Sequence, residues 1–498
     1  MSEIARFLPY GLADLPRLLE RPRAADREAL SAGLLAYLQR LGAPREALEA
    51  ARRLAHPGSR AVVTGQQAGL LTGPGFTFYK AHTALALARE HDRPERPVVP
   101  VFWVASQDHD TAEVRDVQLL DLDERVHTLS LELPPARPAG RIPFLPYAGA
   151  VCELLERFKG VSAVQRRICV ALKGEWTYAE AFARLMLEFL GREGLVLLDP
   201  MAPELAPLFV PGLRRELADP LASSQAINET AEAMRQHGLH PVLGRGEAAT
   251  NLFLEGEDGE RRLLRYREGY FDDGTRRYSR ADLEALLGHD PSRLTPAAGL
   301  RPVLQDTVLP TAAFVVGPGE LKYVAELGGV YRLHGLEPPA VARRVSAVVL
   351  EPPVTRILQK HGLDAWAFQD DPEGCFLAAL AGDDARVAAI RAALGRIAAE
   401  FEGLRPHLLE ATLERPAHRA RVRVTHELER LEHIVLQTEL RREGIAHDQF
   451  ERLRRHLTPS GLPQERVYPF LMYLLKHGEA PLRALKEASS TGRVILEI

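Results

Sequence analysis

Short apolar runs alternate with helical patterns over the first two-thirds of the chain. Five runs have the length and composition of buried strands: Ala61–Val63, Val98–Val104, Gly194–Leu198, Ala312–Val316 and Val345–Leu350. Between the first two runs, apolar residues from Phe78 to Ala88 recur at spacings of three and four, which is the period of a helix. Strands that alternate with helices predict α/β units around a mostly parallel sheet. Ligands usually bind such a sheet at the edge formed by the carboxyl ends of its strands.

Two stretches interrupt this alternation, and we interpret them as insertions into the α/β core. Residues 121–190 begin with an alternating, strand-like pattern and then become helical. Residues 225–300 contain the strand-like Asn251–Leu254 and the turn-like Asp272–Gly274. The first 60 residues, by contrast, have helical spacing with prolines between the segments.

The C-terminal third has a different period, since its apolar residues form two heptad seams. The first seam is Val387, Ile390, Leu394, Ile397, Phe401, Leu404 and Leu408, and the second is Val424, Leu428, Leu431, Val435 and Thr438. Gly403 and Pro406 are typical of a helix end followed by a new start, and Pro416 is expected to kink or break any continuous helix. The seams predict an antiparallel helical arm, with an ordinary helical bundle packed on the core as the alternative.

Composition places these elements in an ordinary globular protein. The chain has 498 residues, 46% hydrophobic and 26% charged, with a net charge of -4. The hydrophobic content excludes a mainly disordered chain, and the nearly neutral net charge argues against a dedicated nucleic-acid binder. We expect a core over residues 1–375, a coiled-coil arm over 376–450 and C-terminal helices over 451–498. Only seven of the 63 basic residues are lysines, so each lysine position is of interest.

The cysteines and the N-terminus bear on the compartment. The three cysteines form no CxxC pair, so neither a zinc knuckle nor a disulfide framework is indicated, and we expect Cys152 and Cys169 to be small buried hydrophobes. Residues 1–20 mix charges into their apolar positions, unlike a signal peptide. No apolar run approaches the roughly 20 residues that span a membrane. We therefore expect a cytoplasmic protein with no membrane or nucleic-acid partner and no bound metal.

A glycine-rich stretch, Thr64–Gly75, follows the first strand and precedes a helix. This position suits an anion or a nucleotide phosphate, because glycines let backbone N–H groups approach and a helix start is positive. The stretch matches neither a Walker A loop nor GxGxxG, and a turn that only connects two elements is an equally good interpretation. The candidate ligand residues here are Thr64, Gly65, Gln66, Gln67, Gly69 and Lys80.

The second strand runs directly into Asp108-His109-Asp110. A carboxylate beside an imidazole can orient it, and an ordinary histidine pKa of about 6.5 suits proton transfer. The alternative is that Asp108 caps a helix while His109 is exposed. Because the triplet ends a buried strand, we favour a catalytic role for His109, Asp108 and Asp110.

A third candidate region surrounds the fourth strand. Arg301, Gln305 and Asp306 precede this strand, and Gly317, Gly319, Glu320 and Lys322 follow it. Glu320 would complement the dipole of the next helix, and Arg301 and Asp306 would pair with each other, if their roles were only structural. We favour a functional role for Glu320 or Lys322.

These stretches together resemble the BshC family, the cysteine ligases of bacillithiol biosynthesis. The resemblance extends in the same order over essentially the whole chain. The matching stretches are Thr64–Gly69, Leu71–Pro74, Tyr79-Lys80, Pro100–Trp103, Asp108–Asp110, Gly194–Pro200, Asn251–Phe253, Arg301-Pro302, Gln305-Asp306, Gly317–Glu320 and Gln464–Arg466.

The resemblance implies a Rossmann-like parallel-sheet core with two connecting-peptide insertions, akin to class I aminoacyl-tRNA synthetases. It also implies a C-terminal α-helical coiled coil that pairs two subunits into a homodimer. The implied activity is addition of cysteine to the amine of glucosaminyl malate, the last step of bacillithiol biosynthesis. The HxGH and KMSKS signatures of the synthetases are absent from the sequence.

Amide formation requires an activated carboxylate, so we expect ATP or ADP to take part. In this hypothesis the Gly65–Gly75 loop and Lys80 hold the anionic group, and His109 helps to deprotonate the amine. Asp108 or Asp110 would orient the imidazole, and Arg301 or Lys322 would bind the malate carboxylates. Asn251 joins the candidates through the resemblance. Two alternatives stay open: a nucleotide-binding coiled-coil scaffold for a separate ligase, and an acyl-activating enzyme with another amine acceptor.

Overall fold

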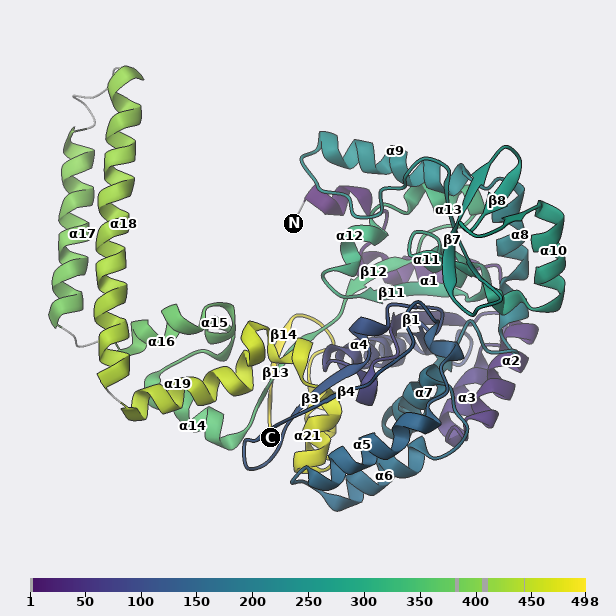
Figure 1. Cartoon of the computed structure of the whole chain (residues 1–498), viewed down its shortest axis with the longest axis horizontal. Coiled ribbons are helices and arrows are strands. Elements are labelled where there is room, and N and C mark those ends of the chain that lie inside the picture. Colours follow the sequence, from purple (N-terminus) through teal and green to yellow (C-terminus); the bar gives the residue numbers. More distant parts are fainter. Residues whose placement is uncertain (1–2, 381–384, 405–410, 443) are drawn as a thin grey trace. The chain divides into compact units, whose positions relative to one another are not determined.

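The computed structural model describes residues 3–380, 385–404, 411–442 and 444–498 (Figure 1). The chain divides into two compact units, each described here by itself. The first is Met1–Ala347 with Tyr468–Leu496, and the second is Val348–Val467 with Glu497–Ile498. The boundary thus lies before the expected residue 375, and most of the last thirty residues return to the first unit.

A five-stranded parallel sheet forms the centre of the first unit. Its strands are β1 (Arg60–Gln66), β2 (Val98–Val104), β5 (Val196–Leu198), β11 (Thr311–Val316) and β12 (Ala340–Arg343), in the order β12-β11-β1-β2-β5. The chain moves outward from β1 through β2 to β5 and then returns to β11 on the other side of β1. The topological switch point, where α/β sheets bind their ligands, therefore lies between β1 and β11.

Four of the five predicted strands are confirmed, and the fifth was placed wrongly. The predicted run Val345–Leu350 forms a strand, β13 (Ser346–Leu350), but this strand lies outside the five-stranded sheet. The fifth position is taken by β12. Two of its three buried residues are alanines, which are depleted in strands, so the run does not stand out in the sequence.

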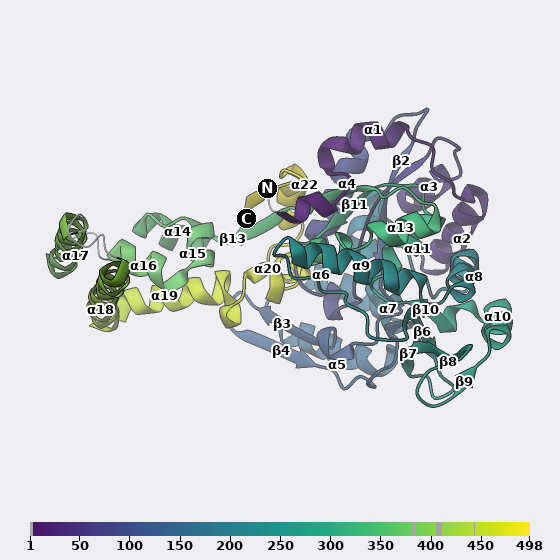
Figure 2. The ribbon, with the colours of Figure 1, turned by 90° about the horizontal axis from the view of Figure 1, so that it is seen from above.

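Helices cover this sheet as the apolar spacing predicts. α4 (Phe76–His91) packs against β1, β2 and β11. The N-terminal helices α1 (Leu15–Glu20), α2 (Arg27–Arg40) and α3 (Arg45–Arg53) pack against strands of the same sheet. α7 (Tyr178–Leu190) begins with a capping box, in which the side chains of Thr177 and Glu180 each accept the other's backbone N–H. Figure 2 shows these helices around the strands.

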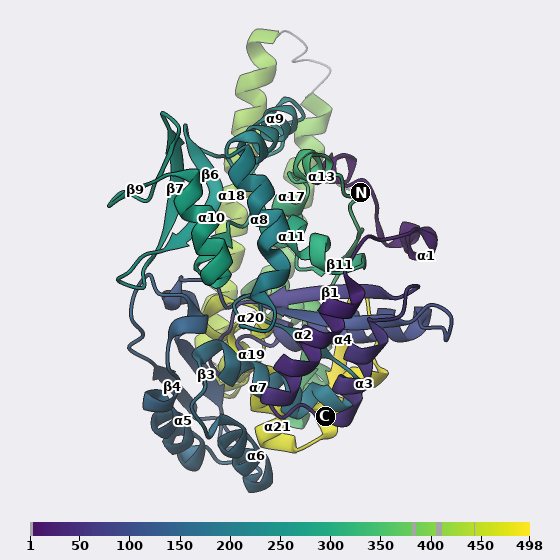
Figure 3. The same cartoon turned by 90° about the vertical axis from the view of Figure 1, so that its right-hand side faces the viewer.

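The two predicted insertions form separate substructures, which lie on the same side of the unit in Figure 3. The first contains a hairpin of β3 (Asp116–Leu120) and β4 (Val126–Ser130), then α5 (Leu145–Arg157) and α6 (Ser162–Leu172). Its hairpin begins before the predicted residue 121, and α7, which the prediction included, contacts β2 through Phe182 and Phe102. The second contains a five-stranded sheet: β10 (Leu294–Pro296), β6 (Ala249–Glu255), β7 (Arg261–Arg267), β8 (Tyr270–Asp272) and β9 (Arg277–Tyr278). α10 (Arg280–His289) joins β9 to β10.

The expectation for two of the cysteines was wrong. Cys152 on α5 and Cys169 on α6 form a disulfide with their Cα atoms 5.9 Å apart, and both are half-buried. The hairpin of the two helices brings together residues that are 17 positions apart. Sequence spacing alone does not reveal such a pair, because the bond depends on the geometry of the two helices.

The second unit is helical. Its core is formed by α14 (Pro352–His361), α15 (Ala365–Asp370), α16 (Pro372–Leu380) and α19 (Gly444–Leu457), around residues such as Phe368, Phe376 and Phe450. α17 (Ala385–Leu404) and α18 (Ala411–Arg442) lie side by side and antiparallel (Figures 1 and 2). This pair is the predicted arm.

One prediction for the helical arm, the kink or break at Pro416, is wrong. α18 runs through Pro416 without a break. Pro416 is the sixth residue of this helix, so the lost N–H leaves a carbonyl of the first turn unpaired and disturbs only that end. α17 is described as far as Leu404, so the helix end expected near Gly403 falls at the limit of the described residues. The predicted Pro406 and Leu408 positions lie outside the described residues. Within the described residues, no helix is long and apolar enough to cross a membrane.

Candidate functional site

The switch point between β1 and β11 holds a compact group of charged side chains. α4 supplies Lys80, α12 (Glu320–Val324) supplies Glu320 and Tyr323, α11 (Arg301–Val308) supplies Arg301, and Arg344 follows β12. We call these five residues the Lys80 cluster. All of them are carried by elements that begin or end at the carboxyl edge of the sheet.

Lys80 is at the centre and is buried, with 2% of its surface exposed. Its ammonium donates to the carbonyl of Gly65 and to Gln66 Oε1, each at 2.9 Å, and forms an ion pair with Glu320 Oε2. An ammonium has three N–H donors, and these three contacts use all of them. Lys80 therefore links the ends of β1 and β11. It has no donor left for a substrate phosphate, although the sequence analysis had expected it to hold an anionic group.

Glu320 is held as a carboxylate. Its Oε2 also accepts the N–H of Gly317 at 2.8 Å, and Tyr323 donates to its Oε1 at 3.3 Å. Burial acts to raise the pKa of Glu320, but Lys80, the Gly317 N–H and Arg301 bring the pKa below its ordinary value. Burial lowers the pKa of Lys80, and Glu320 opposes this effect. Lys80 and Glu320 thus each favour the charged form of the other. This interaction goes beyond the role of a carboxylate that only complements a helix dipole.

Arg301 is the half-buried cation of the cluster. Its guanidinium carbon lies 5.4 Å from the ring centre of Trp103 and 5.3 Å from that of Phe314. Its Nη1 donates to Gln305 Oε1 at 3.0 Å, and Gln305 Nε2 donates to Asp306 Oδ1 at 3.0 Å. Gln305 and Asp306 are buried behind Arg301, so they position it and do not reach a ligand themselves. The direct pair of Arg301 with Asp306, considered as the purely structural alternative, is replaced by these two hydrogen bonds through Gln305.

Arg344 completes the cluster and was missed by the sequence analysis. It is buried, it lies 5.3 Å from the ring centre of Phe76, and its electrostatic effect lowers the pKa of Lys80. Three cations thus surround one carboxylate. The excess positive charge in a largely buried place suits a ligand that carries carboxylate or phosphate groups.

Several backbone N–H groups of the glycine-rich loop already donate hydrogen bonds within the protein. The N–H groups of Gly69, Leu70, Gly73 and Gly75 donate to the carbonyls of Gln67, Val114, Leu70 and Tyr468. These four N–H groups are not free to hold a phosphate, which favours the structural interpretation of the loop. Thr64, buried in β1, donates to the carbonyl of Val315 and so also connects strands.

Glycine is required in this loop for close packing. A Cβ at Gly65 would lie 2.7 Å from the carbonyl oxygen of Trp103, and a Cβ at Gly69 would lie 2.6 Å from Gly73 Cα. The backbone is left-handed at Leu71 and Thr72, with φ of 49° and 74°. Such values are unfavourable for a bulky or β-branched residue and need support from the surroundings.

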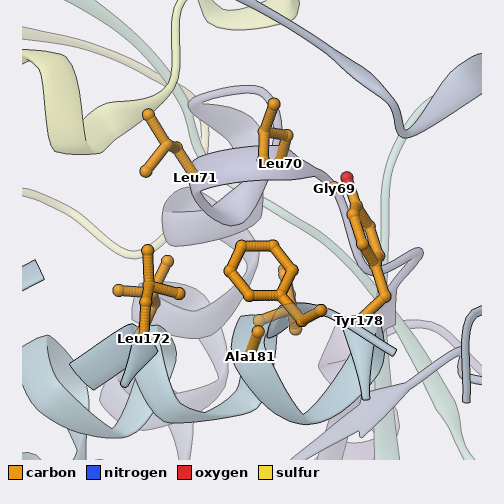
Figure 4. A pocket seen from close by; sticks show the side chains of 9 residues that line it. Gly69, Leu70, Leu71, Leu172, Tyr178 and Ala181 are labelled. Atoms are coloured by element: carbon orange, nitrogen blue, oxygen red, sulfur yellow. The ribbon is translucent and has the colours of Figure 1, made fainter. Parts of the chain in front are cut away.

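Beside these residues lies an apolar pocket, lined in part by Leu70, Leu71, Leu172, Tyr178 and Ala181 (Figure 4). Phe144, Phe182 and Leu185 complete its lining with Gly69. The lining contains no charged side chain, so the pocket suits packing of the loop and not an ionic substrate.

His109 lies in a second group of residues, just after β2. It is half-buried, and its ring centre is 5.5 Å from that of Phe253 on β6. Arg261 on β7 lies with Nη1 3.0 Å from His109 Nδ1. Burial and Arg261 lower the pKa of His109, while Asp108 and Asp110 act in the opposite direction.

The predicted orientation of His109 by a neighbouring carboxylate was wrong. Asp108 Oδ2 accepts instead from Gln67 Nε2 at 2.9 Å, and Asp108 Oδ1 accepts the backbone N–H of Asp110 at 3.0 Å. Gln67 Nε2 also donates to Glu113 at 2.8 Å. The predicted capping helix is only a 3-10 turn, Thr111–Glu113. Arg261, on the second insertion, holds the imidazole.

Three predicted site residues lie apart from both groups. Lys322 is exposed on α12, and Gly319 has open space around it. Asn251 is buried, and its amide donates to Ser223 and Ser224 and accepts from Arg245 Nε. Asn251 therefore ties β6 to α9 (Ala222–Gln236), which is a structural role. Among the described residues, no group of three or more His, Cys, Asp or Glu side chains is placed to hold a metal ion.

Comparison with known proteins identifies the family. The model of the N-terminal Rossmann-like domain of BshC, of bacillithiol biosynthesis, matches residues 13–345, and the model of its C-terminal coiled-coil domain matches residues 348–493. The chain belongs to the BshC family. The Rossmann-like fold with a coiled coil, predicted from the resemblance, is confirmed, and the junction of the two models agrees with the boundary between the compact units.

Relatives match over nearly the whole chain. A Thermus thermophilus protein named "Putative cysteine ligase BshC" is 52% identical over 98% of this chain and 97% of its own length. Proteins of the same name from Salinibacter ruber and Bacillus cereus are 35% and 28% identical, over 94% and 92% of this chain and 88% of their own lengths. The name given to these relatives is that of an enzyme of the ligase class, as the resemblance predicted.

Proposed function

We propose that this BshC-family chain is a ligase that joins the carboxyl group of cysteine to the amine of glucosaminyl malate, in the last step of bacillithiol biosynthesis. The observation that carries the proposal is the Lys80 cluster, where three cations surround one carboxylate at the switch point. Glucosaminyl malate brings two carboxylates to the enzyme and cysteine brings one. Both substrates therefore complement the positive charge of the cluster.

Arg301 is the cation best placed to meet a carboxylate. The three N–H donors of Lys80 are all taken by protein groups, and Arg344 is more deeply buried than Arg301. The hydrogen bond to Gln305 and the rings of Trp103 and Phe314 fix the plane of the guanidinium. A fixed, planar fork of this kind matches a carboxylate in two parallel hydrogen bonds.

The amide bond requires activation of cysteine, and a nucleoside triphosphate supplies it in this proposal. The carboxylate of cysteine attacks ATP, which gives a cysteinyl adenylate and pyrophosphate or a cysteinyl phosphate and ADP. The free amine of glucosaminyl malate then attacks the carbonyl, the C–N bond forms, and AMP or phosphate leaves with the electron pair. The extra proton of the amine passes to water. His109, beside the same edge of the sheet, is the residue we place at the reacting carbonyl.

Mass spectrometry of the products tests this function. The purified chain is incubated with cysteine, ATP and glucosaminyl malate, and the cysteinyl amide is expected together with AMP or ADP. Parallel reactions omit ATP, or replace glucosaminyl malate by glucosamine, which lacks the malate carboxylates. We expect no product without ATP and much less with glucosamine.

Each other outcome points to a different function. If nucleotide binds but no amide appears, the chain is a scaffold for a separate ligase. If glucosamine or another amine reacts as well as glucosaminyl malate, the chain is an acyl-activating enzyme with a different acceptor. Either result would overturn the proposal.

A further inference from the structure

Arg261 fixes the protonation of the His109 ring through the chemistry of the guanidinium. A guanidinium has only N–H donors and cannot accept a hydrogen bond. The 3.0 Å contact between Arg261 Nη1 and His109 Nδ1 therefore requires that Nδ1 accept with its lone pair. In a neutral imidazole, the proton must then be on Nε2.

Arg261 is itself immobilised on three further sides. Its Nε donates to Thr295 Oγ1 at 2.8 Å, and its Nη2 donates to the carbonyl of Pro296 at 2.7 Å. Its guanidinium carbon lies 3.9 Å from the ring centre of Phe253. Burial lowers the pKa of Arg261 to about 10, which leaves the side chain charged at neutral pH. The donor that faces His109 is thus permanent and fixed in direction.

The other ring nitrogen of His109 is available. Within the described part of the chain, no protein group is hydrogen-bonded to Nε2, and the ring is half-buried at the carboxyl end of β2. The charged groups that face this ring are Arg261 on β7 and, on its own loop, Asp108 and Asp110. Burial and Arg261 keep the pKa of His109 below its ordinary value, which favours the neutral ring.

We propose that Arg261 is a positioning residue that holds His109 as the Nε2–H tautomer, so that the imidazole acts as a hydrogen-bond donor to an oxygen of the reacting acyl group. A general-base role, predicted from the sequence, needs a lone pair on Nε2 and a proton on Nδ1. That tautomer would set two N–H donors against each other at Arg261. In the donor role, Nε2–H stabilises the charge that develops on the carbonyl oxygen when the amine attacks.

This inference rests on the proposed function for the identity of the reacting group, but its structural half can be measured without substrate. The ring nitrogens are observed by NMR in the full-length protein with ¹⁵N-labelled histidine, and the His109→Gln variant assigns the signal. We expect an unprotonated Nδ1 and a protonated Nε2. A protonated Nδ1, or a doubly protonated ring at neutral pH, would overturn the proposal.

Variants separate positioning from folding. Arg261→Met removes the donor, so both tautomers of His109 should appear, and its pKa should rise toward 6.5. Arg261→Lys keeps a donor and should restore the Nε2–H tautomer in part. Arg265→Met is the matched control, because Arg265 is exposed on the same strand.

Kinetics complete the test. In Arg261→Met, kcat should fall about tenfold or more while the KM for cysteine changes little, as for other residues that orient a reacting histidine. A folded Arg261→Met protein with an unchanged tautomer and unchanged kcat would refute the role. If the tautomers behave as expected but no amide is formed by the wild type, the proposed function fails while the assignment of Arg261 stands.

Discussion

At the scale of single residues, Lys80 and Arg301 differ in how the protein uses their hydrogen-bond donors. Lys80 draws attention in the sequence because lysine is rare in this chain, yet its three hydrogen-bond donors are all taken by the protein. Arg301 draws less attention, but its guanidinium is half-buried and oriented by Gln305. In the proposed function, the number of free donors, and not the residue type, decides which cation binds the substrate.

Replacing Arg301 tests the binding role. Arg301→Gln keeps a polar side chain but removes the charge, so the KM for glucosaminyl malate should rise roughly tenfold to hundredfold, the value of one charged hydrogen bond. Arg332→Gln, an exposed arginine on α13 (Gly328–His334), is the matched control. Steady-state kinetics of both variants checks the prediction, and an unchanged KM in Arg301→Gln would remove Arg301 from substrate binding.

Replacing Lys80 tests the supporting role. Lys80→Met leaves Glu320 without its cation, and breaking a pair of this kind costs roughly 3 kcal/mol of folding free energy. Calorimetry should show a lower Tm for Lys80→Met. The double variant with Glu320→Gln should lose less folding free energy than the sum of the losses in the two single variants. Additive losses would mean that the two side chains do not stabilise each other.

Asp199 gives a pH dependence with a definite sign. It is buried at the end of β5, and its Oδ1 accepts from the Ser106 hydroxyl and, at 2.8 Å, from the Met201 N–H. Burial raises its pKa to about 6 from an ordinary value of 3.8. The folded state therefore binds more protons than the unfolded state between these values, and stability falls as the pH rises through that range.

Asp199→Asn should remove this slope. Its Tm should exceed that of the wild type above pH 6, and the difference should close as the pH falls toward 4. A shift of about two pKa units corresponds to roughly 3 kcal/mol. Calorimetry across this range checks the prediction, and a difference that is constant with pH would assign the change to packing.

At the scale of elements, the glycine-rich loop is a packing device that holds the strand ends. Gly65→Ala would bring a Cβ within 2.9 Å of both the carbonyl oxygen and the Cβ of Trp103, so β1 and β2 would have to separate. Gly319→Ala meets open space, and the αR conformation of Gly319 accepts alanine. We expect a marked fall in Tm for Gly65→Ala and none for Gly319→Ala, in thermal unfolding followed by circular dichroism. Equal effects of the two changes would contradict the packing role.

The elements also show what the sequence can and cannot predict. Apolar runs of four or more residues identify β2 and β11 correctly, because a parallel strand is buried on both faces. β12 was not predicted, because two of its three buried residues are alanines, which are depleted in strands. Arg261 and Arg344 carry no local pattern, since an arginine within a strand or just after it looks the same whether it is buried or exposed. Their partners are brought in from other elements by the fold.

At the scale of the whole molecule, the helical arm has more apolar surface than a single chain covers. On α17, Val387 is the one fully buried residue among those described. On α18, the seam residues Val424 and Leu431 are 40% and 46% exposed, and Ile434 beside them is 51% exposed. A heptad seam that stays exposed is completed by another helix, and a second copy of the chain supplies an identical one.

We therefore expect a homodimer through α17 and α18, and sedimentation equilibrium at micromolar concentration should give about twice the chain mass of 55.1 kDa. Leu431→Glu places a charge in the seam and should shift the equilibrium to the monomer, because an unpaired charge is costly to bury at such an interface. Val170→Glu is the matched control: Val170 is 60% exposed on α6, outside the seam, and its change should leave the mass unaltered. A wild-type monomer at this concentration would mean that the seams do not pair two chains, and a dimer that persists in Leu431→Glu would place the contact elsewhere.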